Sequence, residues 1–90
     1  MYRASIKQIL VTILSRELLL RLTEIHTVDF IDKDLRLTSE EFNRFLYFVE
    51  MEFNINISEE EISIKSRLSD LVNCIYQKTL NENTLVLKSA

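Results

Sequence analysis

The sequence predicts an all-α protein, a four-helix bundle with three longer helices and one short helix. The chain of 90 residues contains no glycine and no proline, so tight turns and phosphate-binding loops that depend on glycine are not expected. Leucine, isoleucine, glutamate, lysine and arginine are abundant, and these residues favour helices. Apolar residues also recur at intervals of three and four. We therefore expect helices joined by turns of Asn, Asp, Ser and Thr.

The first helix is expected from about Arg3 to Glu24. Val11, Leu19 and Leu20 widen its apolar face. A face this wide is typical of a core helix between two neighbours, or of a helix that keeps apolar surface for a partner. The residues spaced along the centre of this face are Ile6, Ile9, Leu10, Ile13, Leu14, Leu18 and Leu22.

Residues 26–37 lack a sustained period and are rich in aspartate, which predicts a long, ordered loop. Asp29, Asp32 and Asp34 lack the ligand spacing, glycine and terminal glutamate of a calcium-binding loop, so a solvated acidic segment is expected. His26 is expected to be an ordinary loop residue. The residues expected to anchor the loop to the core are Phe30, Ile31, Leu35 and Leu37.

The second long helix is expected to begin at Thr38 or Ser39 and to end near Phe53. Thr38 and Glu41 have the spacing of a capping box, in which each side chain binds a backbone N–H group at the start of a helix. The residues expected on its buried face are Phe42, Phe45, Leu46, Val49 and Phe53.

The remaining segment predicts two further helices. Residues 54–58 alternate polar and apolar and are expected to form an extended connection. Ser58 and Glu61 repeat the capping-box spacing, which predicts a short third helix, and Ser66 is expected to cap a fourth helix that ends near Thr79. Residues 1–80 would then form a single domain. Residues 81–90 would form a tail whose structure the sequence leaves open.

Charge is distributed unevenly along the chain. The formal net charge is -3, and residues 29–61 contain ten acidic residues against three basic ones. Nucleic-acid binding concentrates positive charge instead. The pattern therefore argues against DNA or RNA and favours a partner protein with a basic surface.

The sequence also bears on compartment and catalysis. The single cysteine, Cys74, cannot form an intrachain disulfide, and no zinc-ligand spacing is present. Arg16, Glu17 and Arg21 interrupt the most apolar segment, which is too short for a membrane span. We expect a cytoplasmic protein in a reducing environment, without membrane contact. No pattern of carboxylates or nucleophile and base indicates an enzyme.

The segments Asp34-Leu35-Arg36-Leu37-Thr38-Ser39-Glu40 and Val49-Glu50-Met51-Glu52-Phe53-Asn54-Ile55-Asn56-Ile57-Ser58-Glu59-Glu60-Glu61 resemble the acyl carrier protein family. That family typically reads Asp-Leu-Gly-x-Asp-Ser-Leu. An acidic helix then ends in Glu-x-Glu-Phe, before an isoleucine, a small residue or proline, and an acidic run. The match needs no gap from about Lys33 to Ile75. The resemblance implies a four-helix bundle of acyl carrier protein type.

In this alignment Ser39 falls on the serine that carries 4'-phosphopantetheine in the family. The thiol of that group would hold an acyl or aminoacyl group as a thioester. The implied partners are a phosphopantetheinyl transferase and acyl-transferring or acyl-activating enzymes of fatty acid or polyketide biosynthesis. The protein would be a monomer or weak dimer, and Glu40, Glu41 and Arg44 would form its docking face. The residues expected to line an interior that shelters the acyl chain are Ile13, Phe42, Leu46, Val49, Phe53, Leu68, Leu71 and Ile75.

Three positions depart from the family pattern. Arg36 replaces the usual glycine, Thr38 the aspartate before the serine, and Glu40 the leucine after it. In the family the aspartate and leucine help to engage the transferase. An alternative hypothesis is therefore an unmodified, carrier-like interaction module that binds an enzyme through its acidic face or dimerises through the first helix.

Overall fold

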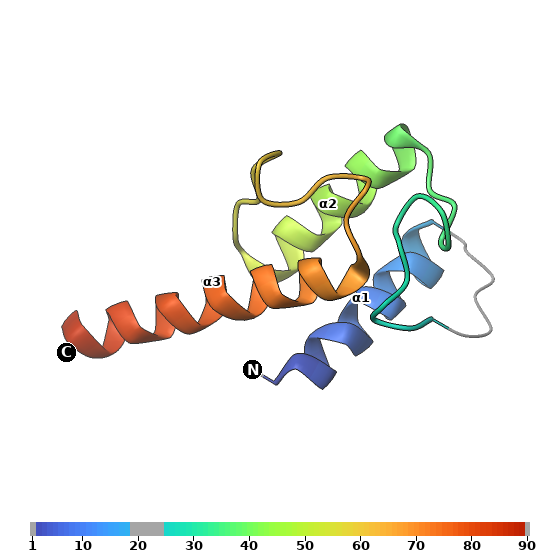
Figure 1. Cartoon of the computed structure of the whole chain (residues 1–90). Helices are drawn as coiled ribbons and strands as arrows, with labels where there is room; N and C mark the ends of the chain where they lie inside the picture. Colours follow the sequence, from blue (N-terminus) through green and yellow to red (C-terminus); the bar gives the residue numbers. More distant parts are fainter. Residues whose placement is uncertain (1, 19–24, 90) are drawn as a thin grey trace.

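The computed structural model describes the backbone of residues 2–18 and 25–89, with side chains through residue 80. Within these ranges the chain forms three helices, α1 (Arg3–Glu17), α2 (Ser39–Phe53) and α3 (Leu68–Ser89), and no strand longer than a single bridge. α1 packs against both α2 and α3, and the three helices surround one apolar core (Figure 1). The predicted all-α class is confirmed.

The core contains the apolar residues that the helical spacing selected. Ile6, Leu10, Ile13 and Leu14 of α1 are buried, as are Phe42, Phe45, Val49 and Phe53 of α2. Phe45 is the largest side chain that is fully buried. Burial of apolar side chains is the main favourable contribution to folding, so these two stripes fix how α1 and α2 pack. From the first turns of α3 the core receives Leu68, Leu71, Val72 and Ile75.

α1 is shorter than predicted. It ends at Glu17, with Leu18 as its C-cap residue, whereas the periodicity predicted an end near Glu24. Leu18 is still buried, so the apolar spacing continues one residue beyond the end of the helix. The predicted face residues Leu19, Leu20 and Leu22 lie outside the described residues.

The predicted capping box of α2 is confirmed. The backbone N–H of Glu41 donates to Thr38 Oγ1 over 3.1 Å, and the N–H of Thr38 donates to Glu41 Oε1 over 3.0 Å. At the other end Asn54 adopts the left-handed conformation, with φ of 54°, and its N–H donates to the carbonyl of Glu50. Asparagine is one of the few residues that tolerate this conformation when glycine is absent.

The long loop is ordered and bound to the start of α3. The N–H of Ile31 donates to the carbonyl of Ser66, and the N–H of Leu68 donates to the carbonyl of Asp29. An isolated antiparallel bridge joins Phe30 to Arg67, whose guanidinium lies 4.0 Å from the Phe30 ring. Of the four predicted anchors, Phe30 is half-buried, and the buried ones are Ile31, Leu35 and Leu37.

The short third helix is absent: residues 54–67, here called the α2–α3 connection, contain turns at 59–61 and 64–65 and no helix. Glu61 Oε1 accepts from the Ser58 N–H, as in a capping box, but it also accepts from the Ser58 hydroxyl. That hydroxyl therefore does not cap the Glu61 N–H, which binds the Ser58 carbonyl instead. The side chain of Ile62 enters the core, so the segment is held by packing and does not continue as a helix.

Both predicted ends of the last helix are wrong. α3 begins at Leu68, where Asp70 Oδ2 accepts the N–H of Arg67, and the Ser66 hydroxyl binds the N–H of Ser63 instead of capping the helix. The helix continues to Ser89, through the Asn-Glu-Asn run at which the sequence predicted its end. Figure 1 shows the C-terminal half of α3 extending beyond α1 and α2.

A membrane-spanning helix was not expected. Across the described residues, no helix combines the length and apolar character needed to cross a bilayer.

Candidate functional site

Ser39 is the first residue of α2, and it is exposed. The preceding Thr38 occupies the N-cap position, and its box with Glu41 fixes the direction in which the helix begins. The next N–H groups, those of Glu41 and Phe42, bind Thr38, while the N–H groups of Ser39 and Glu40 have no acceptor among the described residues. The Ser39 hydroxyl is thus presented beside unpaired N–H groups at the positive end of a helix.

A groove lined in part by Ser39 lies between α2 and the α2–α3 connection. Its volume is about 380 Å³, within the range of roughly 300–1,000 Å³ that small-molecule sites occupy. We call it the Ser39 groove. Its polar lining residues are exposed, namely Ser39, Asn43, Glu59 and Ser63, and its apolar lining residues are buried or half-buried, namely Phe42, Leu46, Ile57, Ile62 and Ile64.

The α2–α3 connection forms one wall of this groove because polar contacts hold it against α2. Glu50 Oε2 accepts the N–H of Ile57 over 2.8 Å, and the Glu50 carbonyl accepts the N–H of Ile55 over 3.1 Å. These bonds place the alternating isoleucines of the segment beside the apolar face of α2. A chain joined to the Ser39 hydroxyl therefore has an apolar surface within reach.

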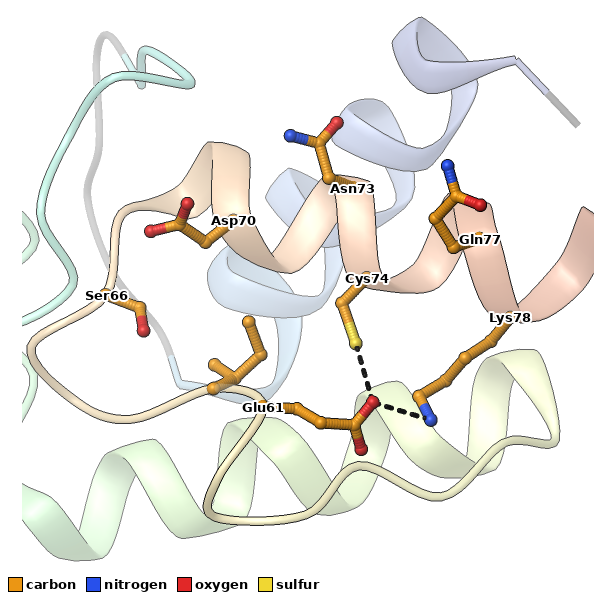
Figure 2. Close-up of a pocket in the computed structure, with 8 residues that line it drawn as sticks. Glu61, Ser66, Asp70, Asn73, Cys74, Gln77 and Lys78 are labelled. Atoms are coloured by element: carbon orange, nitrogen blue, oxygen red, sulfur yellow. Dashed lines mark hydrogen bonds and ion pairs between the residues drawn. The ribbon is translucent and has the colours of Figure 1, made fainter.

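A second, wider depression lies where the same connection meets α3, with a volume of about 610 Å³. Figure 2 shows Glu61 pointing toward Lys78 and Cys74 on α3. Glu61 Oε2 lies 2.9 Å from Lys78 Nζ, and the Cys74 thiol donates to the same carboxylate over 3.7 Å. The depression is open, and two of its charged side chains, Glu61 and Lys78, pair with each other.

The electrostatics of this depression argue against nucleophilic catalysis. The hydrogen bond from Lys78, together with that from the Ser58 N–H, lowers the pKa of Glu61 to about 2. Burial, and then the nearby Glu61 charge, raise the pKa of the Cys74 thiol. Because the thiolate is the reactive form, Cys74 is a half-buried thiol that its surroundings keep protonated.

The three predicted docking residues lie in the first two turns of α2, and their environments differ. Glu40 is exposed. Glu41 is half-buried and its carboxylate is engaged in the capping box. Arg44 Nη2 donates to the carbonyl of Glu17 over 3.3 Å, so this side chain joins α2 to the end of α1.

Sequence reasoning missed two exposed apolar residues on α2. Tyr47 is 57% exposed and Met51 is 63% exposed. Glu40, Arg44, Tyr47 and Met51 are separated by four, three and four residues, which places them on one face of the helix. The signal was present in the sequence, because both residues interrupt the polar side of an otherwise amphipathic helix.

Most of the predicted interior residues do not line the groove. Phe42 and Leu46 do, and the other six are buried in the core, namely Ile13, Val49, Phe53, Leu68, Leu71 and Ile75. The apolar surface near Ser39 comes instead from the isoleucines of the α2–α3 connection, whose position depends on tertiary contacts.

The aspartates of the long loop have structural roles. Asp29 Oδ2 accepts the N–H of His26 over 2.8 Å, Asp34 Oδ2 accepts the N–H of Phe30 over 2.7 Å, and Asp32 Oδ2 pairs with Lys65 Nζ over 2.8 Å. Throughout the part of the chain that the structure describes, no three His, Cys, Asp or Glu side chains form a group that could hold a metal ion.

Comparisons with protein-family models, with curated proteins and with solved structures give no match to this chain.

Proposed function

We propose that the protein is a carrier: a partner transferase attaches 4'-phosphopantetheine to the Ser39 hydroxyl, and the thiol of that group carries an acyl or aminoacyl cargo as a thioester. The observation that carries the proposal is the position of Ser39. It is an exposed hydroxyl at the N-terminus of α2 and lines a partly apolar groove of about 380 Å³.

The residues around Ser39 fit a phosphodiester. The unpaired N–H groups of Ser39 and Glu40 and the positive end of the α2 dipole favour an anion by about 0.3–1 kcal/mol. The carboxylate of Glu40 opposes this, but it is exposed and is screened by solvent and salt. The Ser39 groove offers the attached arm and a short cargo an apolar surface to lie on.

Arg36 gives independent support to the resemblance on which the proposal rests. The family pattern has glycine at this position, and Arg36 adopts a φ of 58°, in the left-handed region that glycine favours. The chain therefore makes the turn before Ser39 with the backbone shape that the family's glycine would allow, using a residue that tolerates it poorly.

The protein acts as a substrate of its partners in this proposal. Among the described residues that line the Ser39 groove, Glu59 is the only one with a titratable side chain, so in this proposal the base that activates the hydroxyl comes from the transferase. Ser39 Oγ forms the new bond to the phosphorus of coenzyme A that bears the pantetheine, the P–O bond of the pyrophosphate bridge breaks, the hydroxyl proton passes to that base, and adenosine 3',5'-bisphosphate leaves. The phosphopantetheine thiol then supplies the site for the thioester.

The test is intact mass spectrometry after incubation with coenzyme A and several promiscuous phosphopantetheinyl transferases. We expect the wild-type chain to gain the mass of one phosphopantetheine. Ser63→Ala is the matched control, because Ser63 lines the same groove and is exposed; it should be modified like wild type, whereas Ser39→Ala should not. The absence of modification with every transferase would reject the proposal.

The exposed Tyr47 and Met51 favour a second candidate, a carrier-like module that binds a partner protein without being modified. Such apolar anchors, on a helix with four acidic residues and one basic residue, suit a partner with a basic rim. Affinity capture with wild type, Ser39→Ala and Tyr47→Ala would separate the two. Binding that needs Tyr47, in a protein that no transferase modifies, would support the unmodified module. If neither variant loses binding, the unmodified module is rejected.

A further inference from the structure

A pocket separate from the Ser39 groove combines residues from α1, the long loop and the first turns of α3. Its volume is about 230 Å³, and we call it the α1–α3 pocket. It shares no residue with the Ser39 groove. Two small apolar residues, Ala4 and Val72, form part of its lining, and the polar lining residues are Arg3, Lys7, Thr27, Ser69 and Asn73.

Every polar side chain in this lining carries hydrogen-bond donors, and none is a carboxylate. Arg3 Nε donates to Asn73 Oδ1 over 2.9 Å, which occupies the amide oxygen and leaves the amide NH₂ group to donate elsewhere. Figure 2 shows Asn73 pointing away from Cys74 and Lys78. The pocket thus presents donors from three separate segments of the chain.

Contacts outside the pocket hold these donors in place. The Arg3 guanidinium lies 4.0 Å from the centre of the Tyr76 ring, a cation–π contact that fixes a long side chain. The N–H of Ser69 donates to the carbonyl of Thr27 over 2.6 Å, which brings two hydroxyl-bearing residues together. Neither hydroxyl has a hydrogen-bond partner within the described part of the chain.

The positive charge of the pocket is uncompensated. Arg3 and Lys7 are one helical turn apart, a like-charge spacing that costs roughly 0.2–0.5 kcal/mol, and the first turn of α1 contains no acidic residue. Among the described residues no carboxylate pairs with either side chain, although Lys7 is half-buried. A bound anion would relieve both the repulsion and the unfavourable position of two cations at a helix N-terminus.

We propose that the α1–α3 pocket binds the phosphate group of a small phosphorylated compound. A phosphate carries close to two negative charges at neutral pH, which matches the two cations, and its oxygens accept hydrogen bonds from the surrounding hydroxyl and amide groups. Arginine and lysine are both established phosphate ligands in proteins. The pocket is smaller than the roughly 300–1,000 Å³ of drug-sized sites, so it suits a phosphate with a short organic part. This inference does not depend on the proposed function of Ser39.

The experiment is an NMR titration of the full chain in a buffer free of phosphate, with inorganic phosphate, glycerol 3-phosphate and acetate as separate probes. We expect saturable shifts of the backbone amides of residues 3–7, 27 and 69–73. Equal affinity for the first two probes means that the phosphate group alone is recognised, and tighter binding of glycerol 3-phosphate means that its organic part contributes. Both results support the proposal.

Variants locate the binding. Lys7→Gln is expected to raise the Kd for glycerol 3-phosphate about 10-fold, the usual loss for one hydrogen bond to a charged group. Lys33→Gln removes the same charge from an exposed residue outside the pocket and should change the Kd less than about 2-fold. Ser69→Ala, which leaves the charge unchanged, should also weaken binding. Equal loss in both lysine variants, equal affinity for acetate, or no saturable shifts would overturn the proposal.

Discussion

Glu61 and Lys78 join the α2–α3 connection to α3 through an ion pair of 2.9 Å. The connection has no helix of its own, so this contact and the burial of Ile62 hold it in place. The same segment forms one wall of the Ser39 groove. The pair therefore influences the shape of the groove from the opposite side of the connection.

Removal of this ion pair is expected to have a pH-dependent effect on stability. The folded pKa of Glu61 is about 2, below its ordinary value of 4.5, chiefly because of the hydrogen bond from Lys78. A lowered folded pKa contributes stability above the unfolded value, and this contribution is lost as the pH falls through the folded value. Wild type should therefore be more stable than Glu61→Gln at neutral pH, and the difference should shrink between about pH 4.5 and pH 2.

Urea denaturation of both proteins across this pH range measures the effect. Glu60→Gln is the control, because Glu60 is an exposed neighbour with no ion pair in the described part of the chain. A difference between wild type and Glu61→Gln that stays constant from neutral pH to pH 2 would contradict the role of Lys78.

Cys74 is expected to react slowly with iodoacetamide in the folded protein. Burial raises the pKa of its thiol, and the negative charge of Glu61 adds to this effect, so little thiolate is present near neutral pH. Glu61→Gln should increase the alkylation rate by removing that charge. The measurement is the rate of mass gain against pH, with urea-unfolded protein as the reference. A folded rate equal to the unfolded rate would show that the thiol is not protected.

Arg36→Gly is expected to stabilise the protein by about 0.5–1 kcal/mol. The left-handed conformation costs a residue with a β-carbon about 1–2 kcal/mol, and the greater freedom of glycine in the unfolded chain offsets part of the gain. Arg36 is exposed and has a φ of 58°. Asn54→Gly serves as the control, since asparagine already tolerates its φ of 54° and should gain less. Thermal denaturation measures both, and a destabilised Arg36→Gly protein would refute the expectation.

Thr38→Ala is expected to destabilise the protein by about 0.5–2 kcal/mol, because the N–H of Glu41 loses its side-chain acceptor. Thr38→Ser keeps the hydroxyl and should remain close to wild type. Ser39→Ala, one position later, alters an exposed side chain and should change stability by less than about 0.5 kcal/mol. Chemical denaturation of the three variants distinguishes the contribution of the Thr38 cap from that of the neighbouring Ser39 hydroxyl. Equal losses of stability in Thr38→Ala and Ser39→Ala would contradict the role of Thr38 as the cap.

The sequence alone determined the local features of this protein. The capping box between Thr38 and Glu41, the start of α2 at Ser39 and the buried stripes of α1 and α2 depend on residues within one or two helical turns. Interactions over such short separations are encoded by spacing. The candidate attachment residue, Ser39, was named from the resemblance to the acyl carrier protein family, and the local cap explains only why it stands at the first position of α2.

Tertiary structure decided the features that depend on distant residues. The capping pattern at Ser58 does not start a helix: the Ser58 hydroxyl binds Glu61 Oε1, Glu61 Oε2 pairs with Lys78 of α3, and Ile62 enters the core. The isoleucine wall of the Ser39 groove follows from this. The α1–α3 pocket brings Lys7, Thr27 and Ser69 together. These residues are far apart in sequence, and no local pattern specifies such contacts.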